Sequence, residues 1–250
     1  MISIQSQSVA QDIYPIFEVD PAPDGPGPIA INFRGTGFLV SRNLFMTCWH
    51  CVDPPAAEGH HLALVGSTEL GRLRAAPLLE ISRDLDGFDL ATARIRADPR
   101  LPFTLEETIA EFGTDVATFG YPLTDTPTEM RPTFRVNGRY LRGYITRDFN
   151  YDGLEGGEVR SYEVDMRAPE GLSGAPLVAR GTRRLVGVIY GQNEVGTIDR
   201  FVSVDSEGKR IPEVQQVESF ALAHHTSTVL KHRSEATDGV ALEELLRGSS

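Results

Sequence analysis

Short apolar runs separated by turn residues extend along most of the chain, and they predict β-strands. Glycine, proline, aspartate and asparagine between the runs favour turns and do not continue a strand. Many short strands at this spacing, with scarcely a helical period between residues 30 and 223, favour packed barrels or sandwiches. The predicted strands are Ile13–Val19, Ala30–Ser41, Leu62–Val65, Leu90–Ile95, Val116–Phe119, Thr133–Val136, Tyr140–Ile145, Val159–Asp165, Ala175–Val178, Leu185–Tyr190 and Ser219–Ala223.

Helical signals gather at the end of the chain. Thr226 is a predicted N-cap for a helix over Ser227–His232, since a hydroxyl can accept a bond from first-turn amides. Asp238 is predicted to cap a turn or two whose apolar positions are Ala241, Leu242, Leu245 and Leu246. We therefore expect a short helical appendage that packs on the domain or docks a partner.

Length and composition fit an all-β protein. A chain of 250 residues can bury a sufficient core as one large all-β domain or two small ones. The 24 glycines and 16 prolines indicate many turns, and two cysteines cannot supply the disulfide framework of small secreted domains.

The charge balance argues against a nucleic-acid partner. The formal net charge is -11, whereas phosphate recognition needs clustered positive charge. Lys209 and Lys231 are the only lysines beside abundant arginine, alanine and glycine, which suggests a GC-rich bacterial genome. The first eight residues lack the parts of a secretory signal, and no segment has the roughly 20 apolar residues of a membrane span. We expect a cytoplasmic protein without a membrane partner.

Three short motifs carry candidate catalytic chemistry. Ser173 lies between Gly171 and Gly174, as a nucleophile on a tight backbone turn requires. His50 offers a general base and Asp89 a carboxylate to orient it. Their order along the chain, His50, Asp89, Ser173, matches the chymotrypsin arrangement. The backbone N–H groups of Gly171 and Ser173 would then form an oxyanion hole.

Each motif also has a simpler interpretation. Ser173 alone suits an ordinary glycine turn, and His50 alone suits a buried core histidine. Asp84 and Asp86 compete with Asp89 for the orienting role, although Asp89 opens the apolar strand. The ordered set of three favours a triad over these separate accounts.

Metal sites are weaker hypotheses. The Asp84–Asp89 segment lacks the acidic spacing and distant glutamate of a calcium loop. Cys48-x-x-Cys51 could bind a metal or act in redox chemistry with His60 and His61, but no second Cys-x-x-Cys exists, so we expect two free thiols, no metal and no cofactor. His224 and His225 are expected to be structural or exposed.

Several stretches together resemble the trypsin-like (chymotrypsin-fold) serine peptidases, especially the bacterial branch that includes HtrA-type proteases. The stretches that carry the resemblance are Gly35–Ser41, Thr47–Cys51, Phe88–Ala91, Gly120–Pro122, Gly171–Val178 and Leu185–Gly191. The resemblance implies two packed six-stranded antiparallel β-barrels with the active site between them, and endopeptidase activity on polypeptides. We expect a peptidase domain over residues 1–232, with barrels at about 12–110 and 114–225, and a helical tail at 233–250.

The chain departs from the digestive members of this family at two places. Leu172 stands where they have an aspartate before the serine, which argues against activation by N-terminal clipping. A bridge from Cys51 to Cys48, three positions earlier, would strain the segment that holds His50.

Alignment to the family motifs also suggests a substrate pocket. One wall would come from Arg167, Ala168 and Glu170, another from Ile189, Tyr190 and Gly191, and Glu218 would approach the base. Arg167 would favour an acidic side chain before the cut and Glu218 a basic one. The Asn150–Glu158 stretch is either a gating loop or a solvated hairpin tip.

The sequence therefore predicts a regulated, cytoplasmic bacterial serine endopeptidase, with a regulatory protein partner as a further hypothesis. Two alternatives stay open. One is a catalytically silent peptide-binding module on the same fold, and the other is an esterase that uses the same triad.

Overall fold

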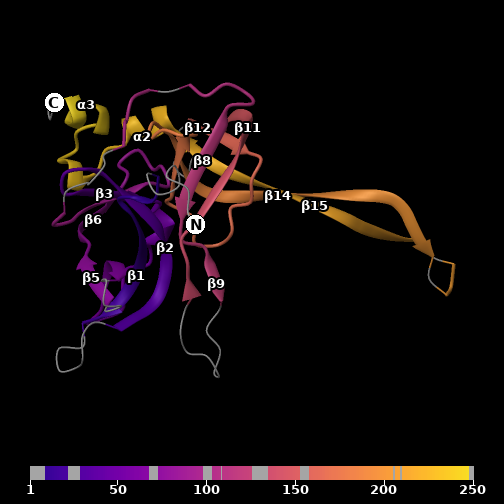
Figure 1. Cartoon of the computed structure of the whole chain (residues 1–250), viewed down its shortest axis with the longest axis horizontal. Coiled ribbons are helices and arrows are strands. Elements are labelled where there is room, and N and C mark those ends of the chain that lie inside the picture. Colours follow the sequence, from indigo (N-terminus) through magenta and orange to yellow (C-terminus); the bar gives the residue numbers. More distant parts are fainter. Residues whose placement is uncertain are drawn as a thin grey trace.

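The computed structural model (Figure 1) describes most of the chain. The described residues are 9–21, 29–67, 73–97, 103–107, 109–125, 135–152, 158–204, 206–208 and 210–247.

The N-terminal half forms one curled antiparallel sheet. Its seven described strands lie in the order β5-β4-β1-β2-β3-β7-β6. Register shifts between β1 and β2, at Ile16/Phe17 and Glu18/Val19, are bulges that bend and twist this pair. The strands are β1 (Ile13–Asp20), β2 (Ile29–Ser41), β3 (Leu44–Thr47), β4 (His61–Ser67), β5 (Leu73–Pro77), β6 (Leu79–Arg83) and β7 (Ala91–Arg94).

The C-terminal half forms a closed barrel, in the order β11-β12-β15-β14-β13-β8. Its strands are β8 (Asp115–Gly120), β11 (Arg139–Asp152), β12 (Glu158–Val164), β13 (Pro176–Ala179), β14 (Leu185–Val204) and β15 (Arg210–His225). A small ribbon of β9 (Leu123–Asp125) and β10 (Arg135–Val136) lies outside it. The all-β class and the chymotrypsin-like arrangement of two curled antiparallel sheets are confirmed. Six strands form the second barrel, as predicted, whereas the first sheet has seven described strands because β5 and β6 both pair at its edges. The domain boundaries given above stay a prediction.

Apolar side chains fill the interiors of both sheets. Phe38 and Phe45 are fully buried in the first, and Tyr162 and Leu177 in the second. The apolar cluster of the first sheet also includes Val188 from β14, other residues of the second barrel and residues from the C-terminal end of the chain. The two halves are therefore joined by continuous apolar packing, which stabilises their contact in proportion to the area removed from water.

One buried threonine of β2 makes polar contacts across this junction. The Thr36 hydroxyl donates to the Gly171 carbonyl at 2.7 Å and accepts from the Tyr121 N–H at 3.0 Å. The Thr36 N–H donates to the Ser173 carbonyl at 2.9 Å, and the Thr36 carbonyl accepts from the Thr47 hydroxyl at 2.7 Å. Every polar atom of Thr36 is thus engaged, and two of them hold the turn that carries Ser173.

The β14–β15 hairpin is much longer than the sequence predicts. Predicted ends at Tyr190 and Ser219 are wrong, because β14 runs on to Val204 and β15 begins at Arg210. The resulting arm projects far from the barrel (Figure 1). Strand β11 likewise continues to Asp152, so the first part of the predicted 150–158 loop, including Asn150, belongs to a strand. Residues 153–157 of that loop lie outside the described residues, and β12 begins at Glu158.

The C-terminal helices begin at residues other than those predicted. Helix α2 (Thr226–Lys231) is capped by His225, whose side chain accepts from the Ser227 N–H. Thr226 instead donates its hydroxyl to the carbonyls of Leu185 and Val186.

Asp238 is likewise not an N-cap. It ends the 3-10 turn η2 (Glu235–Thr237) in the left-handed conformation, and helix α3 (Leu242–Arg247) follows. None of the helices in the described ranges is long and apolar enough to span a membrane.

We expect Thr36→Val to destabilise the junction. Valine keeps the shape but leaves the buried Gly171 carbonyl and Tyr121 N–H without their partner, which should lower the free energy of unfolding by about 2 to 4 kcal/mol. Urea unfolding measures this change. Thr36→Ser is the matched control, because it keeps the hydroxyl and should cost about 1 kcal/mol for the lost methyl group. Equal stabilities of the valine variant and the parent would contradict the role given to this hydroxyl.

Candidate active site

His50 is held by both oxygens of one carboxylate. It lies in the short turn η1 (Trp49–Cys51) that follows β3. The His50 Nδ1 lies 2.7 Å from Asp89 Oδ2, and the His50 backbone N–H donates to Asp89 Oδ1 at 3.0 Å. A carboxylate at Nδ1 places the proton there and leaves Nε2 as the free ring nitrogen.

Asp89 belongs to a compact loop, residues 84–90, which we call the aspartate loop. The Asp84 N–H donates to the Leu90 carbonyl at 3.1 Å and closes the loop at its base. Asp84 Oδ1 accepts from the N–H groups of Asp86 and Phe88, at 2.9 and 3.1 Å. These bonds fix the backbone on both sides of Asp89.

The two competing carboxylates have other partners. Asp84 Oδ2 lies 2.6 Å from Nδ1 of His232, and Asp86 pairs with Arg233. Neither is the His50 partner in the structure, whereas Asp89 is.

The Asp89 hydrogen bond dominates the electrostatics of His50. It raises the pKa of the imidazole to about 10, with a smaller contribution from the Cys51 side chain, while burial opposes the shift. Because 48% of the imidazole surface is exposed, the ring is open to solvent and to a ligand. The raised pKa favours the protonated imidazole, and the neutral ring with a free Nε2 is favoured as the pH rises.

Two left-handed glycines shape the turn that carries Ser173. Gly171 has a φ of +90° and Gly174 a φ of +84°. A Cβ at Gly171 would lie 2.3 Å from Phe33 Cε1, and one at Gly174 would lie 2.0 Å from the Thr36 carbonyl oxygen. Only glycine satisfies both the backbone conformation and the close approach.

Ser173 lies beside the segment that carries His50. Its carbonyl accepts from the Thr36 N–H and lies 3.5 Å from the thiol of Cys51, the residue after His50. Its hydroxyl donates to the Tyr190 carbonyl at 3.4 Å, and no hydrogen bond to His50 is present among the described contacts. Rotation about the Cα–Cβ bond is the change that would redirect this hydroxyl, and apo catalytic bonds are often long.

The predicted oxyanion-hole amides are free of internal partners. Within the described part of the chain, the N–H groups of Gly171 and Ser173 donate to no backbone or side-chain acceptor. The intervening Leu172 N–H instead turns back to the Pro169 carbonyl at 3.1 Å. Two unpaired amides on one turn are suited to bind an anionic oxygen.

Both cysteines are free and buried. The Cys48 thiol donates to the Ile189 carbonyl at 3.2 Å, and burial raises its pKa well above the ordinary value. Ligand atoms of Cys48, His50 and Asp89 lie within 4.8 Å of one another, close enough to share a metal ion. Such an ion would have to displace the His50–Asp89 bond and ionise a thiol that burial keeps neutral.

The predicted pocket residues occupy different environments. Ile189 is buried and its carbonyl accepts from the Gly174 N–H at 2.7 Å, while Tyr190 is half-buried and stacks on His224 with ring centroids 4.4 Å apart. Ala168 is buried, and Gly191 has open space around it.

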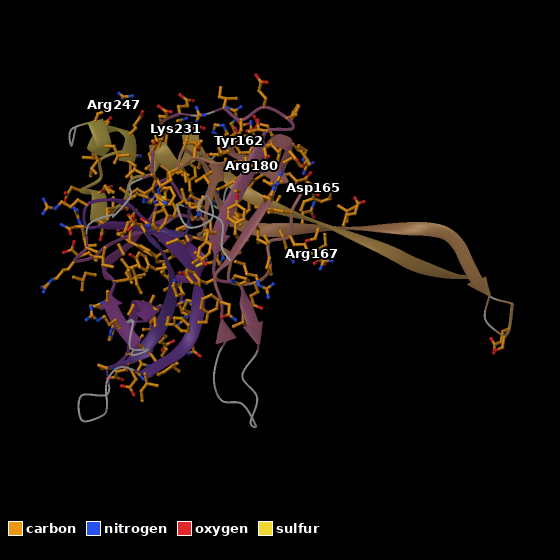
Figure 2. The ribbon with its side chains drawn as sticks, in the orientation of Figure 1. Tyr162, Asp165, Arg167, Arg180, Lys231 and Arg247 are labelled. Atoms are coloured by element: carbon orange, nitrogen blue, oxygen red, sulfur yellow. The ribbon has the colours of Figure 1, made fainter. Side chains whose placement is uncertain are left out.

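The charged pocket candidates are all exposed. Arg167, labelled in Figure 2, lies near the base of the β14–β15 arm, Glu170 is exposed beside the Ser173 turn, and Glu218 faces Val195 along the arm. The roles of all these residues in substrate binding stay predictions.

Several supporting residues of the site carry little or no signal in the sequence. The glycines on either side of Thr36 indicate that another part of the backbone approaches closely here. They do not indicate that the Thr36 hydroxyl bonds to the turn that carries Ser173. His224 and His225 are fully buried, as the structural alternative expected, and burial lowers the pKa of each to about 4. Nothing in the spacing indicated the contact of His232 with the aspartate loop.

Comparison with solved structures finds the same fold in bacterial proteases. The active form of the Rv3671c protease from M. tuberculosis superposes with a TM-score of 0.56 at 17% identity, over 90% of this chain and 81% of that one. The MamO protease domain from Magnetospirillum magneticum gives 0.52 at 16% identity, over 96% and 97%. The HtrA-type protease AlgW with a decapeptide gives 0.55 at 16% identity, over 88% and 62%.

The family assignment comes from the sequence comparison. A search of curated proteins found no significant match. The family model of the trypsin-like peptidase domain matches residues 35–188, which is more than half of the chain and includes the positions of His50, Asp89 and Ser173. The chain therefore belongs to the trypsin-like peptidase family and is a serine endopeptidase.

Proposed function

We propose that this endopeptidase cuts polypeptides through a triad of His50, Asp89 and Ser173, with the Gly171 and Ser173 N–H groups as its oxyanion hole. The observation that carries the proposal is the double contact of Asp89 with His50, at the backbone N–H and at Nδ1. This contact fixes both the orientation and the tautomer of the imidazole, as a general base for serine requires.

The proposed reaction follows from these groups. His50 Nε2 takes the proton of the Ser173 hydroxyl while Oγ forms a bond to the scissile carbonyl carbon. The carbonyl oxygen becomes an oxyanion held by the Gly171 and Ser173 amides, each such donor being worth about 3 kcal/mol. His50 then gives its proton to the leaving amine as the C–N bond breaks. Water, deprotonated by His50, hydrolyses the acyl-enzyme and regenerates Ser173.

Both alternatives to proteolysis lack specific support. A silent peptide-binding module has no requirement for a bidentate carboxylate on His50 together with free amides at Gly171 and Ser173. An esterase would use the same groups, and it is separated from a protease by its substrate.

Regulated action inside a bacterial cell is a further part of the proposal. Its support is the amino-acid composition, which suggests a bacterial genome, and the short helices α2 and α3 that follow the second barrel. Three points stay predictions: that the protein has a regulatory protein partner, that it cuts a small number of polypeptide substrates, and that it has no nucleic-acid or membrane partner. A protease that cut many cellular proteins without a switch would be harmful to its own cell, so few cuts are expected.

We expect a fluorophosphonate probe to label Ser173 in the wild-type protein, since only an activated serine attacks it. Ser173→Ala should lose the label entirely, and peptide mapping identifies the site. An unlabelled wild-type protein that is folded by circular dichroism would favour the silent module.

Terminal-peptide profiling of a bacterial lysate treated with the protein then distinguishes a protease from an esterase, and regulated cutting from general degradation. New N-termini that depend on Ser173 identify a protease, and a small number of them supports regulated action. Ester hydrolysis without new termini would identify an esterase. Rapid general degradation of denatured proteins would contradict regulation.

The labelling rate should depend on pH through His50. Because the neutral imidazole is the active base and its pKa is raised to about 10, the rate is expected to rise with pH through the alkaline range and to fall as protons bind below it. Asp89→Asn removes the main cause of the raised pKa, so its acid limb should move to lower pH while the maximal rate drops by about 10⁴.

Asp148→Asn is the matched control, because it removes a carboxylate from an ion pair with Arg160 on the second barrel. Its profile should coincide with that of the wild type. An identical acid limb in the wild type and Asp89→Asn would contradict the assigned role of Asp89.

A further inference from the structure

The chain returns from the second barrel to the aspartate loop after helix α2. Residues 232–238, which we call the C-terminal segment, make their contacts with the loop and with the neighbouring strands β6 and β7 of the first sheet. The segment is therefore built against the loop that holds Asp89.

His232 contacts the loop from the protein interior. It is fully buried, and its Nδ1 lies 2.6 Å from Asp84 Oδ2, an atom that is fully buried as well. Its Nε2 lies 3.1 Å from the hydroxyl of Thr92, a residue of β7 three positions after Asp89. Both ring nitrogens of His232 are thus bound to the loop and the strand that follows it.

Arg233 contacts the loop at its outer side. The Leu85 N–H donates to the Arg233 carbonyl at 2.8 Å, and the Arg233 N–H donates to Asp84 Oδ2 at 3.3 Å. The Arg233 guanidinium binds both oxygens of Asp86. Two consecutive residues of the C-terminal segment therefore bind three residues of the loop.

The segment itself is anchored in the first sheet. The Ser234 hydroxyl contacts the Thr92 hydroxyl, and the Ala236 N–H donates to the Ser82 hydroxyl of β6 at 2.9 Å. Ala236 and Leu242 are buried in the core of that sheet. These anchors fix His232 relative to the strands on both sides of the loop.

We propose that His232 is a positioning residue for Asp89, acting through Asp84. The proposal rests on the triad proposed above. Asp84 binds the N–H of Phe88 and, through its own N–H, the carbonyl of Leu90, so it holds both neighbours of Asp89. His232 supplies the closest contact of the buried Asp84 carboxylate, at 2.6 Å from Oδ2.

Loss of this donor has a defined consequence. Asp84 Oδ2 would keep only its longer bond, the one from the Arg233 N–H at 3.3 Å, and a buried carboxylate that loses its closest donor is unfavourable, so the loop must rearrange. This rearrangement alters the acceptor of the Phe88 N–H and displaces Asp89 from its two contacts with His50. Misplacement of a catalytic group by about 1 Å can cost about a hundredfold in rate.

The test compares three variants by their rate of fluorophosphonate labelling across pH. His232→Leu removes both ring nitrogens at similar bulk. His232→Asn is the conservative variant, because its amide nitrogen can occupy the place of Nδ1 and donate to Asp84. Ser82→Ala is the matched control, because it loses another contact with the C-terminal segment but none with the loop.

We expect His232→Leu to label about tenfold or more slowly, with its acid limb moved to lower pH because Asp89 no longer holds His50. Among the described residues, the titratable groups that act on the imidazole are Asp89, Cys48, Cys51 and His224, and none of them is altered. His232→Asn should recover most of the rate and the limb. Ser82→Ala should keep the wild-type rate and limb, even where its melting temperature is lower.

The proposal would be overturned if folded His232→Leu kept the wild-type labelling rate and pH profile. It would also be overturned if Ser82→Ala lost as much labelling rate as His232→Leu. If His232→Leu does not fold, the asparagine variant decides the question through the proton NMR signal of the His50–Asp89 hydrogen bond, which should persist in it. Loss of that signal in a folded asparagine variant that still donates to Asp84 would also overturn the proposal. Failure of the triad is a separate result, seen as the absence of Ser173 labelling in the wild type.

Discussion

The contact of Thr36 with the Ser173 turn is the interaction on which the site depends. In the proposed triad, a nucleophile from one sheet and a base from the other can meet only if the two halves are docked in one register. Two atoms of Thr36 make this contact, because its N–H donates to the Ser173 carbonyl and its hydroxyl donates to the Gly171 carbonyl. The same contact explains why residue 174 is glycine, since any Cβ there would strike the Thr36 carbonyl.

Two histidine–carboxylate pairs involve the aspartate loop, and they differ in their exposure to solvent. The His50–Asp89 pair is open to solvent, which suits the proton exchange with a substrate that we propose for it. His232–Asp84 is fully enclosed and cannot reach a substrate, so its effect is on geometry. Burial distinguishes two chemically similar pairs, and we propose that the exposed one reacts while the enclosed one positions it through the loop.

The sequence predicted the parts of the fold whose residues are constrained locally. The glycine turn at Ser173 and the pairing of His50 with Asp89 could be predicted because the chemistry of these groups limits the residues around them. The β14–β15 arm was missed, because a two-stranded ribbon with polar residues such as Gln192 and Glu194 lacks the alternation of a half-buried strand. Threonine has a higher N-cap propensity than histidine, but the Thr226 hydroxyl donates to backbone carbonyls of β14. His225 therefore caps helix α2. Asp84 and His232 lie 148 positions apart, so only the fold reveals their contact.

The decisive experiment is a crystal structure of the protein with a phosphonate bound covalently to Ser173, because it fixes the proposed nucleophile in its reacted state. We expect a phosphoryl oxygen within hydrogen-bond distance of the Gly171 and Ser173 N–H groups, His50 Nε2 beside Oγ, and an unchanged Thr36 contact with the turn. An imidazole that stays out of reach of Oγ, or amides that turn away from the phosphoryl oxygen, would contradict this expectation.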